Sequence, residues 1–199
     1  QTRILREFGI EVGGGLGPTA PPIWRVGLMG VNANRETADR VLAAGRIALA
    51  ADILGACERA IEMAVAYAKQ REQFGRTIAT FQAVKHLCAE MVAELEPARS
   101  LLWYAAYAFD ARPEEASLLA LHAKAHFAEI GTFITRTATE VHGGIGFTDA
   151  YDLHLWFKRV GLDRQLLGTP ELLRAEAATL QFGAGQGGAG RQVISVSGY

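Results

Sequence analysis

The sequence of 199 residues is short of cysteine, of net charge and of long apolar runs. Its two cysteines, Cys57 and Cys88, cannot build a disulfide framework or a Cys-x-x-Cys metal or redox site, which favours a reducing, cytoplasmic location. Twenty basic and 21 acidic side chains leave a net charge of −1. This balance argues against a nucleic-acid-binding surface. Charges also interrupt every apolar run before it reaches the roughly 18–20 residues of a membrane-spanning helix.

The chain opens with Gln1 and shows no signal-peptide pattern, so we expect residues to precede it. Only eight of its 22 glycines fall within residues 46–182. The Gly- and Pro-rich stretch 11–22 can hold neither a helix nor a central strand. The sequence therefore predicts an irregular segment over 1–35, a folded body over 36–182 and a Gly-rich tail over 183–199.

Apolar residues in the body recur at three- and four-residue steps, which is the period of an α-helix. In the first predicted helix this series is Val41, Ala44, Ala48, Ala51, Leu54, Cys57, Ile61 and Val65. We expect helices over about 36–72, 80–109, 113–141, 150–166 and 170–182. Three of them are long and joined by short turns, so the prediction is an all-α, up-and-down four-helix bundle plus a short C-terminal helix.

Prolines and glycines mark the predicted helix limits. Pro97 lies inside the second helix and predicts a kink there. Pro113 suits the first position of the third helix, and Gly143 and Gly144 end it. No alternating pattern typical of a strand is evident, although 192–196 is a candidate for a short one.

Two segments carry residues suited to a phosphate ligand. Residues 71–78 read REQFGRTI, and residues 142–148 read HGGIGFT. A Gly-Gly-x-Gly stretch at a helix end lets the backbone approach a phosphate without a Cβ clash. An arginine beside an exposed phenylalanine offers a charge to a pyrophosphate and a flat face to a ring. Taken alone, however, such a glycine turn is more often an ordinary helix cap.

Together, four spaced motifs resemble the C-terminal helical domain of the acyl-CoA dehydrogenase flavoprotein family. They are Arg71–Gly75, Ile78–Gln82, Gly143–Gly146 and Gly168–Thr169. The resemblance covers about 36–182 and makes 1–35 the end of an upstream β-type domain. It implies α,β-dehydrogenation of an acyl-CoA substrate with FAD, as in β-oxidation and steroid degradation. It also implies a homo- or hetero-tetramer that passes electrons to electron-transfer flavoprotein or a similar acceptor.

The resemblance assigns cofactor contacts to the motif residues. Arg71 would meet the pyrophosphate of a neighbouring subunit's FAD, and Phe74 would pack near its adenosine. Gly168 and Thr169 would touch the FAD of their own subunit, while Arg46 belongs to the substrate site. The remaining implied FAD contacts are Gln73, Phe81, Gln82, His142, Gly143, Gly144 and Gly146.

The catalytic base of the family has no counterpart here. Most members place a glutamate immediately before the Gly-Thr pair, where this chain has Leu167. A minority place it just before the arginine that corresponds to Arg46, where this chain has Gly45. Either Glu171 or Asp163 replaces it, or the chain resembles the base-lacking subunit of bacterial heteromeric members that act on steroid-CoA thioesters. A non-enzymatic assembly subunit and a self-sufficient homotetramer with a displaced base remain alternatives.

Other candidate sites have plainer interpretations. His122 and His126 are spaced as in zinc sites, but no glutamate lies between them and no third ligand is evident, so we expect no metal. His142 and His154 flank the glycine turn and suit capping or surface roles, or a nucleotide pocket. The aromatic group on the second helix is typical of a core or an interface. Its members are Trp103, Tyr104, Tyr107 and Phe109.

Overall fold

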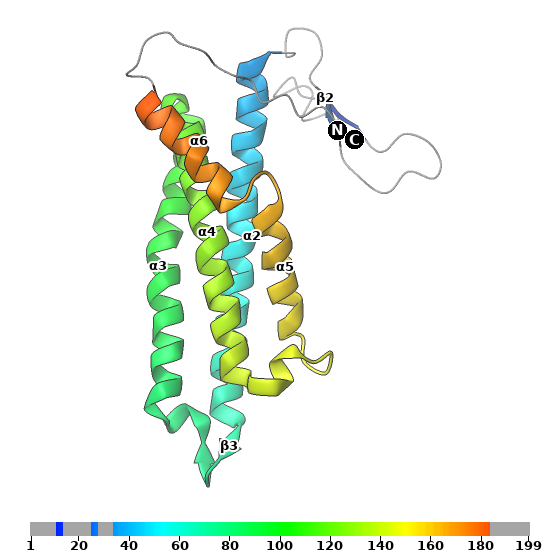
Figure 1. Cartoon of the computed structure of the whole chain (residues 1–199), viewed down its shortest axis with the longest axis vertical. Helices are drawn as coiled ribbons and strands as arrows, with labels where there is room; N and C mark the ends of the chain where they lie inside the picture. The colour runs from blue at the N-terminus through cyan, green and yellow to red at the C-terminus, as the bar shows by residue number, and fades with distance from the viewer. Residues whose placement is uncertain (1–10, 14–24, 28–33, 184–199) are drawn as a thin grey trace, which may run out of the picture.

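The computed structural model describes residues 11–13, 25–27 and 34–183. Three long helices, α2 (Arg35–Gln70), α3 (Gln82–Ala111) and α4 (Pro113–His142), run up and down beside one another (Figure 1). Helix α5 (Leu153–Gln165) completes the bundle against α2 and α4, and α6 (Pro170–Phe182) packs on α4. The predicted all-α bundle with a short C-terminal helix is confirmed, with α4 in contact with all four other helices.

Two short hairpins correct the expectation that strands are lacking. Strand β1 (Glu11–Gly13) pairs antiparallel with β2 (Arg25–Gly27), so six residues of the segment predicted to be irregular are in strands. Strand β3 (Glu72–Gln73) pairs with β4 (Arg76–Thr77) directly after α2. Strands of two and three residues are too short to show an alternating pattern. The candidate strand at 192–196 lies outside the described residues.

The helix limits follow from local capping. The Asn34 side chain accepts a hydrogen bond from the Thr37 amide at 2.9 Å and so caps the start of α2. The predicted start of α3 at about 80 is two residues early, because Ile78–Thr80 forms a 3-10 turn. Helix α5 likewise begins at Leu153, because a second 3-10 turn occupies Gly143–Phe147. Helix α3 continues on both sides of Pro97.

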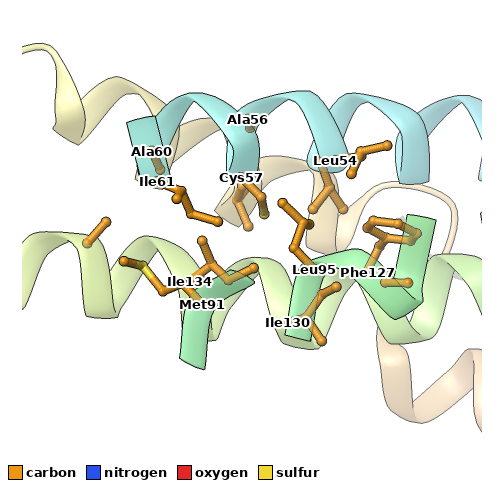
Figure 2. Close-up of a cluster of buried hydrophobic side chains, with 14 of the residues drawn as sticks. Leu54, Ala56, Cys57, Ala60, Ile61, Met91, Leu95, Phe127, Ile130 and Ile134 are labelled. Atoms are coloured by element: carbon orange, nitrogen blue, oxygen red, sulfur yellow. The ribbon is translucent and has the colours of Figure 1, made fainter. Parts of the chain in front are cut away.

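The core between the long helices combines large aliphatic side chains with many alanines. Figure 2 shows Ile61 of α2, Met91 of α3 and Ile134 of α4 pointing into one shared space. Alanines let the backbones approach closely where they face inward, as Ala56 and Ala60 do. The apolar series predicted from the sequence identifies the buried face in the C-terminal half of α2, where Leu54, Cys57 and Ile61 are buried, but not in the N-terminal half, because alanine suits either face. Three members of that series are exposed: Ala44, Ala48 and Ala51.

Gly131 marks the point where three helices come closest. A Cβ atom there would lie 2.6 Å from Ile53 Cγ2 of α2 and 3.0 Å from Val160 Cγ1 of α5. Both neighbours are themselves buried, so neither has room to withdraw. Helix α4 can therefore pack against α2 and α5 at this level only with glycine at position 131.

We expect Gly131→Ala to lower the free energy of unfolding by about 1–3 kcal/mol through overpacking. Gly55→Ala is the matched control, because a Cβ at that exposed position of α2 would meet nothing within 4 Å. Helix propensity alone should make this control more stable by up to about 1 kcal/mol. Urea denaturation of the three proteins measures both effects. Equal changes for the two substitutions would contradict the close packing at Gly131.

Candidate functional site

The β3–β4 hairpin holds a strained, exposed phenylalanine at its tip. Phe74 has φ 54° and Gly75 has φ 75°, and positive φ at both residues is what a two-residue type I′ turn requires. A bulky side chain is uncommon in this region, and Phe74 is nevertheless 92% exposed. Backbone strain of this kind persists where the surroundings impose it and is typical of functional sites. The hairpin therefore presents the Phe74 ring to solvent or to a ligand.

Polar and aromatic side chains surround this tip. The rings of Phe81 and Phe74 lie edge to face, with 6.1 Å between their centroids. The Arg76 guanidinium carbon lies over the Phe81 ring, 4.1 Å from the ring centroid. Arg71, Gln73 and Gln82 are exposed. The structure thus gathers all five hairpin residues that the resemblance assigns to FAD.

The glycine turn that follows α4 is open on one side. Gly143 has φ 66°, and a Cβ atom on Gly143 or Gly144 would meet nothing within 4 Å. Both residues are exposed, so a ligand can reach their backbone. Gly146 differs, because a Cβ there would lie 3.0 Å from His142 Cβ and 3.3 Å from the Thr139 carbonyl oxygen. Gly146 therefore allows close packing, and Gly143 and Gly144 form the accessible part of the turn.

His142 supports this turn from inside the protein. It is only 4% exposed, and its ring stacks on Tyr67 at 4.6 Å and lies 4.9 Å from the ring of Tyr151. Its Nδ1 lies 2.7 Å from the Ala138 carbonyl oxygen, which assigns the proton of the neutral ring to Nδ1. Burial lowers the pKa of His142 below its usual value. These contacts hold the His142 ring between α2 and the glycine turn.

The turn between α5 and α6 brings together Leu167 and Gly45, the two positions to which the resemblance assigns the family's base. Leu167 has φ 56° and Gly168 has φ 115°. A Cβ atom on Gly45 would lie 2.6 Å from Leu167 Cδ1. The Leu167 side chain therefore lies directly on Gly45 of α2. Neither position holds a carboxylate, and an apolar side chain fills the space between them.

Arg46 joins this turn to α6. Its Nε donates to the Leu167 carbonyl oxygen at 3.2 Å, while Nη1 and Nη2 donate to the two carboxylate oxygens of Glu176 at 3.1 and 2.9 Å. The Arg46 side chain is 10% exposed. Sequence reasoning missed Glu176, because its partner lies 130 positions earlier in the chain. The one available signal was that a buried arginine requires a counter-charge.

The two carboxylates considered as replacement bases lie in unlike environments. Burial raises the pKa of Asp163 to about 6, which suits a base, but the side chain is 1% exposed and lies near the buried Lys124. Glu171 is exposed and paired with Arg164 at 3.1 Å. Hydrogen bonds from its own backbone amide and from Thr169 lower the pKa of Glu171. Asp163 is therefore sealed in the core, and Glu171 is a weakened base.

The remaining candidates lie apart from these features. His122 is exposed and His126 is half-buried beside the ring of Phe127. Among the described residues, no three His, Cys, Asp or Glu side chains are grouped to hold a metal ion. Trp103 and Tyr107 are exposed on α3 and not in the core. Within the same part of the chain, no helix is both long and apolar enough to cross a membrane.

Comparison with known proteins identifies the family. The sequence-family model "Acyl-CoA dehydrogenase, C-terminal domain" matches residues 35–179, and the chain belongs to this family. The matched segment begins with the first residue of α2 and ends three residues before the end of α6. It thus contains the hairpin, the glycine turn and the turn at Leu167.

Individual relatives and solved structures support the same family assignment. Acyl-CoA dehydrogenase IpdE2 of Mycolicibacterium smegmatis is 37% identical over 131 residues, which cover 65% of this chain and 40% of the relative. A solved variant of the Tcur3481–Tcur3483 steroid ACAD is 30% identical with a TM-score of 0.72 and covers 88% of this chain and 48% of that one. The ChsE4–ChsE5 complex from Mycobacterium tuberculosis is 26% identical with a TM-score of 0.69, covering 89% and 50%. The chain spans about two fifths of the length of the curated relatives it matches.

We expect His142→Phe to reduce the loss of stability on acidification. Because burial lowers the pKa of His142, the unfolded chain binds more protons than the folded one as the pH falls below about 6.5. Wild-type stability from this group is therefore present above that pH and lost below it. Phenylalanine keeps a ring between Tyr67 and Tyr151 but does not titrate.

Urea denaturation at pH 7.5 and 5.5 measures the difference. The control is His122→Asn, which removes an exposed histidine and should keep the pH dependence of the wild type. The same loss of stability in His142→Phe as in the wild type would show that the buried ring is not acid-sensitive.

Proposed function

We propose that this chain is the C-terminal part of a subunit of an FAD-dependent acyl-CoA dehydrogenase and supplies flavin-binding surface and oligomer contacts but no catalytic base. The observation that carries the proposal is the contact of Leu167 with Gly45. Removal of an α-proton needs a basic side chain within about 3 Å of that proton. Leucine and glycine offer none at either family position. We therefore assign the glutamate to another chain of the complex.

The exposed residues at one end of the bundle fit FAD. Arg71 would pair with the pyrophosphate, and the exposed ring of Phe74 would pack on the adenosine. The open backbone at Gly143 and Gly144 would lie against the dinucleotide, since no Cβ blocks the approach. When bound, FAD supplies the acceptor for the hydride that leaves the β-carbon.

The length of α2 supports sharing of flavins between subunits. Between Arg46 and Gln70 the helix rises about 36 Å at 1.5 Å per residue. Figure 1 places the β3–β4 hairpin and the turn after α4 at one end of the bundle, far from the α5–α6 connection. One chain would therefore contact two flavins, with the hairpin and glycine turn on a neighbour's FAD and Gly168 and Thr169 on its own. Such sharing requires an oligomer.

The kinds of relative favour a particular partner and substrate class. One solved relative is a steroid ACAD, and another is a complex of two differently named chains. We therefore propose a heterotetramer that acts on the CoA thioester of a steroid-derived side chain and passes electrons to electron-transfer flavoprotein or a similar acceptor.

A second candidate is an assembly subunit without an acyl pocket of its own. The side chain of Leu167 favours it by filling the space over Gly45. The first candidate would bind acyl-CoA next to this turn, whereas the assembly subunit would not. A self-sufficient enzyme is disfavoured, because Asp163 is sealed in the core and the pKa of Glu171 is lowered.

Native mass spectrometry of the full-length protein purified from its own host tests the proposal. We expect a hetero-oligomer that contains a second acyl-CoA dehydrogenase chain and fewer FAD molecules than subunits. The measurement reports subunit identity and flavin count together. A homotetramer with one FAD per chain and turnover without a partner would contradict a base-lacking role.

Substitution at the hairpin tip tests the flavin contact. We expect Arg71→Ala combined with Phe74→Asn to lower the flavin retained by the complex at least tenfold. Asparagine tolerates positive φ, so Phe74→Asn should keep the hairpin and leave the melting temperature unchanged or raised. The matched control is Trp103→Ala, which also removes an exposed aromatic ring, but from α3 and not from the hairpin. Absorbance at the flavin band after gel filtration gives the result, and full retention in the double variant would rule out the contact.

A further inference from the structure

The turn from Leu167 to Thr169 is held in a conformation that it would not adopt unaided. Leu167 lies in the left-handed region at φ 56°, and Gly168 follows at φ 115°. For a leucine, this backbone conformation is strained and must be stabilised by neighbouring groups. The turn leads directly into α6, where the Leu173 amide donates to the Thr169 carbonyl oxygen at 2.9 Å.

Three contacts restrain the turn. The Leu167 side chain lies on Gly45, and Gly168 lies so close to Leu173 that a Cβ atom would be 2.8 Å from its Cδ2. The third contact is the hydrogen bond from Arg46 Nε to the Leu167 carbonyl oxygen at 3.2 Å. It is the one of these three contacts that is polar and directional, and it is made to the carbonyl group of the Leu167–Gly168 peptide, so it sets the orientation of that peptide.

Glu176 determines how Arg46 points. The two terminal nitrogens of Arg46 donate to the two carboxylate oxygens of Glu176, at 3.1 and 2.9 Å. A planar guanidinium fixed at two points has its third donor fixed as well. Glu176 also supplies the negative charge that the largely buried Arg46 needs. Removal of the carboxylate would leave Arg46 both unpaired and free to turn.

We propose that Arg46 and Glu176 are positioning residues that hold the Leu167–Thr169 turn in the form in which Gly168 and Thr169 contact the subunit's own FAD. The proposal rests on the proposed function, since the flavin contact of these two residues belongs to it. Arg46 would act through the Leu167 carbonyl oxygen, and Glu176 would act through Arg46.

The test uses the full-length complex with Glu176→Gln, which keeps the shape of the side chain and removes its charge. The matched control is Glu129→Gln. Glu129 of α4 forms a similar bidentate pair with Arg174 of α6, but makes no contact with the turn in the hydrogen bonds and ion pairs of the described residues. Glu176→Asp keeps a carboxylate and should recover part of the effect.

Two readouts separate positioning from general loss of stability. In the flavin-free complex, amide hydrogen exchange at Leu173 should be about tenfold faster in Glu176→Gln than in the wild type and unchanged in Glu129→Gln. The FAD dissociation constant should rise about tenfold in Glu176→Gln, with Glu176→Asp between the two. The melting temperature should fall further in Glu176→Gln than in Glu129→Gln, because Arg46 is largely buried and Arg174 is half-exposed. Faster exchange at Leu173 that is not shared by Ala177 of the same helix separates positioning from this general destabilisation.

Each failure has a distinct meaning. Unchanged exchange at Leu173 in Glu176→Gln would overturn the restraint itself. Faster exchange with an unchanged FAD dissociation constant would overturn the positioning of the flavin contact and leave the proposed function intact. A wild-type subunit whose own site binds no FAD would overturn this role together with the own-flavin contact of the proposed function, and would leave the hairpin contact with a neighbour's FAD intact.

Discussion

The close approach of α2, α4 and α5 at Gly131 is the packing constraint on which the rest of the structure depends. Ile53 and Val160 reach the α4 backbone there, because no side chain stands between them. This contact keeps α5 against α2, so that the chain leaving α5 passes over the N-terminal half of α2. Leu167 therefore reaches Gly45, and its carbonyl oxygen reaches Arg46. The geometry of the turn is thus a consequence of helix packing far from it.

The helices were predictable because each carries many periodic residues and clear limits. Pro170 and Gly183 bracket α6, whose observed bounds match the prediction to the residue. The core face of the N-terminal half of α2 was not predictable, because alanine is as compatible with solvent as with the interior. The β3–β4 hairpin was missed for another reason. Its two-residue strands are set by the positive φ angles of Phe74 and Gly75, which the composition of the segment does not express.

In the candidate site, too, some features were predictable from the sequence and others were not. Exposed motif residues such as Arg71 and Gly143 lie at the surface, in agreement with the sequence reasoning. The burial of His142 depends on Tyr67, which lies on another helix, and no local pattern predicts that contact. The partner of Arg46 was still harder to find, since Glu176 is one of several glutamates and only the tertiary fold selects it.

This pairing also explains how the chain remains folded without a glutamate at either family position. A largely buried arginine requires a negative partner, and removal of one member of such a pair is strongly destabilising. In this chain, the negative charge at Arg46 comes from Glu176 on α6, and not from position 167 or position 45. Those two positions are then free to be apolar and to pack on each other. The absence of a carboxylate there is consequently compatible with an ordered turn, which the proposed flavin-binding role requires.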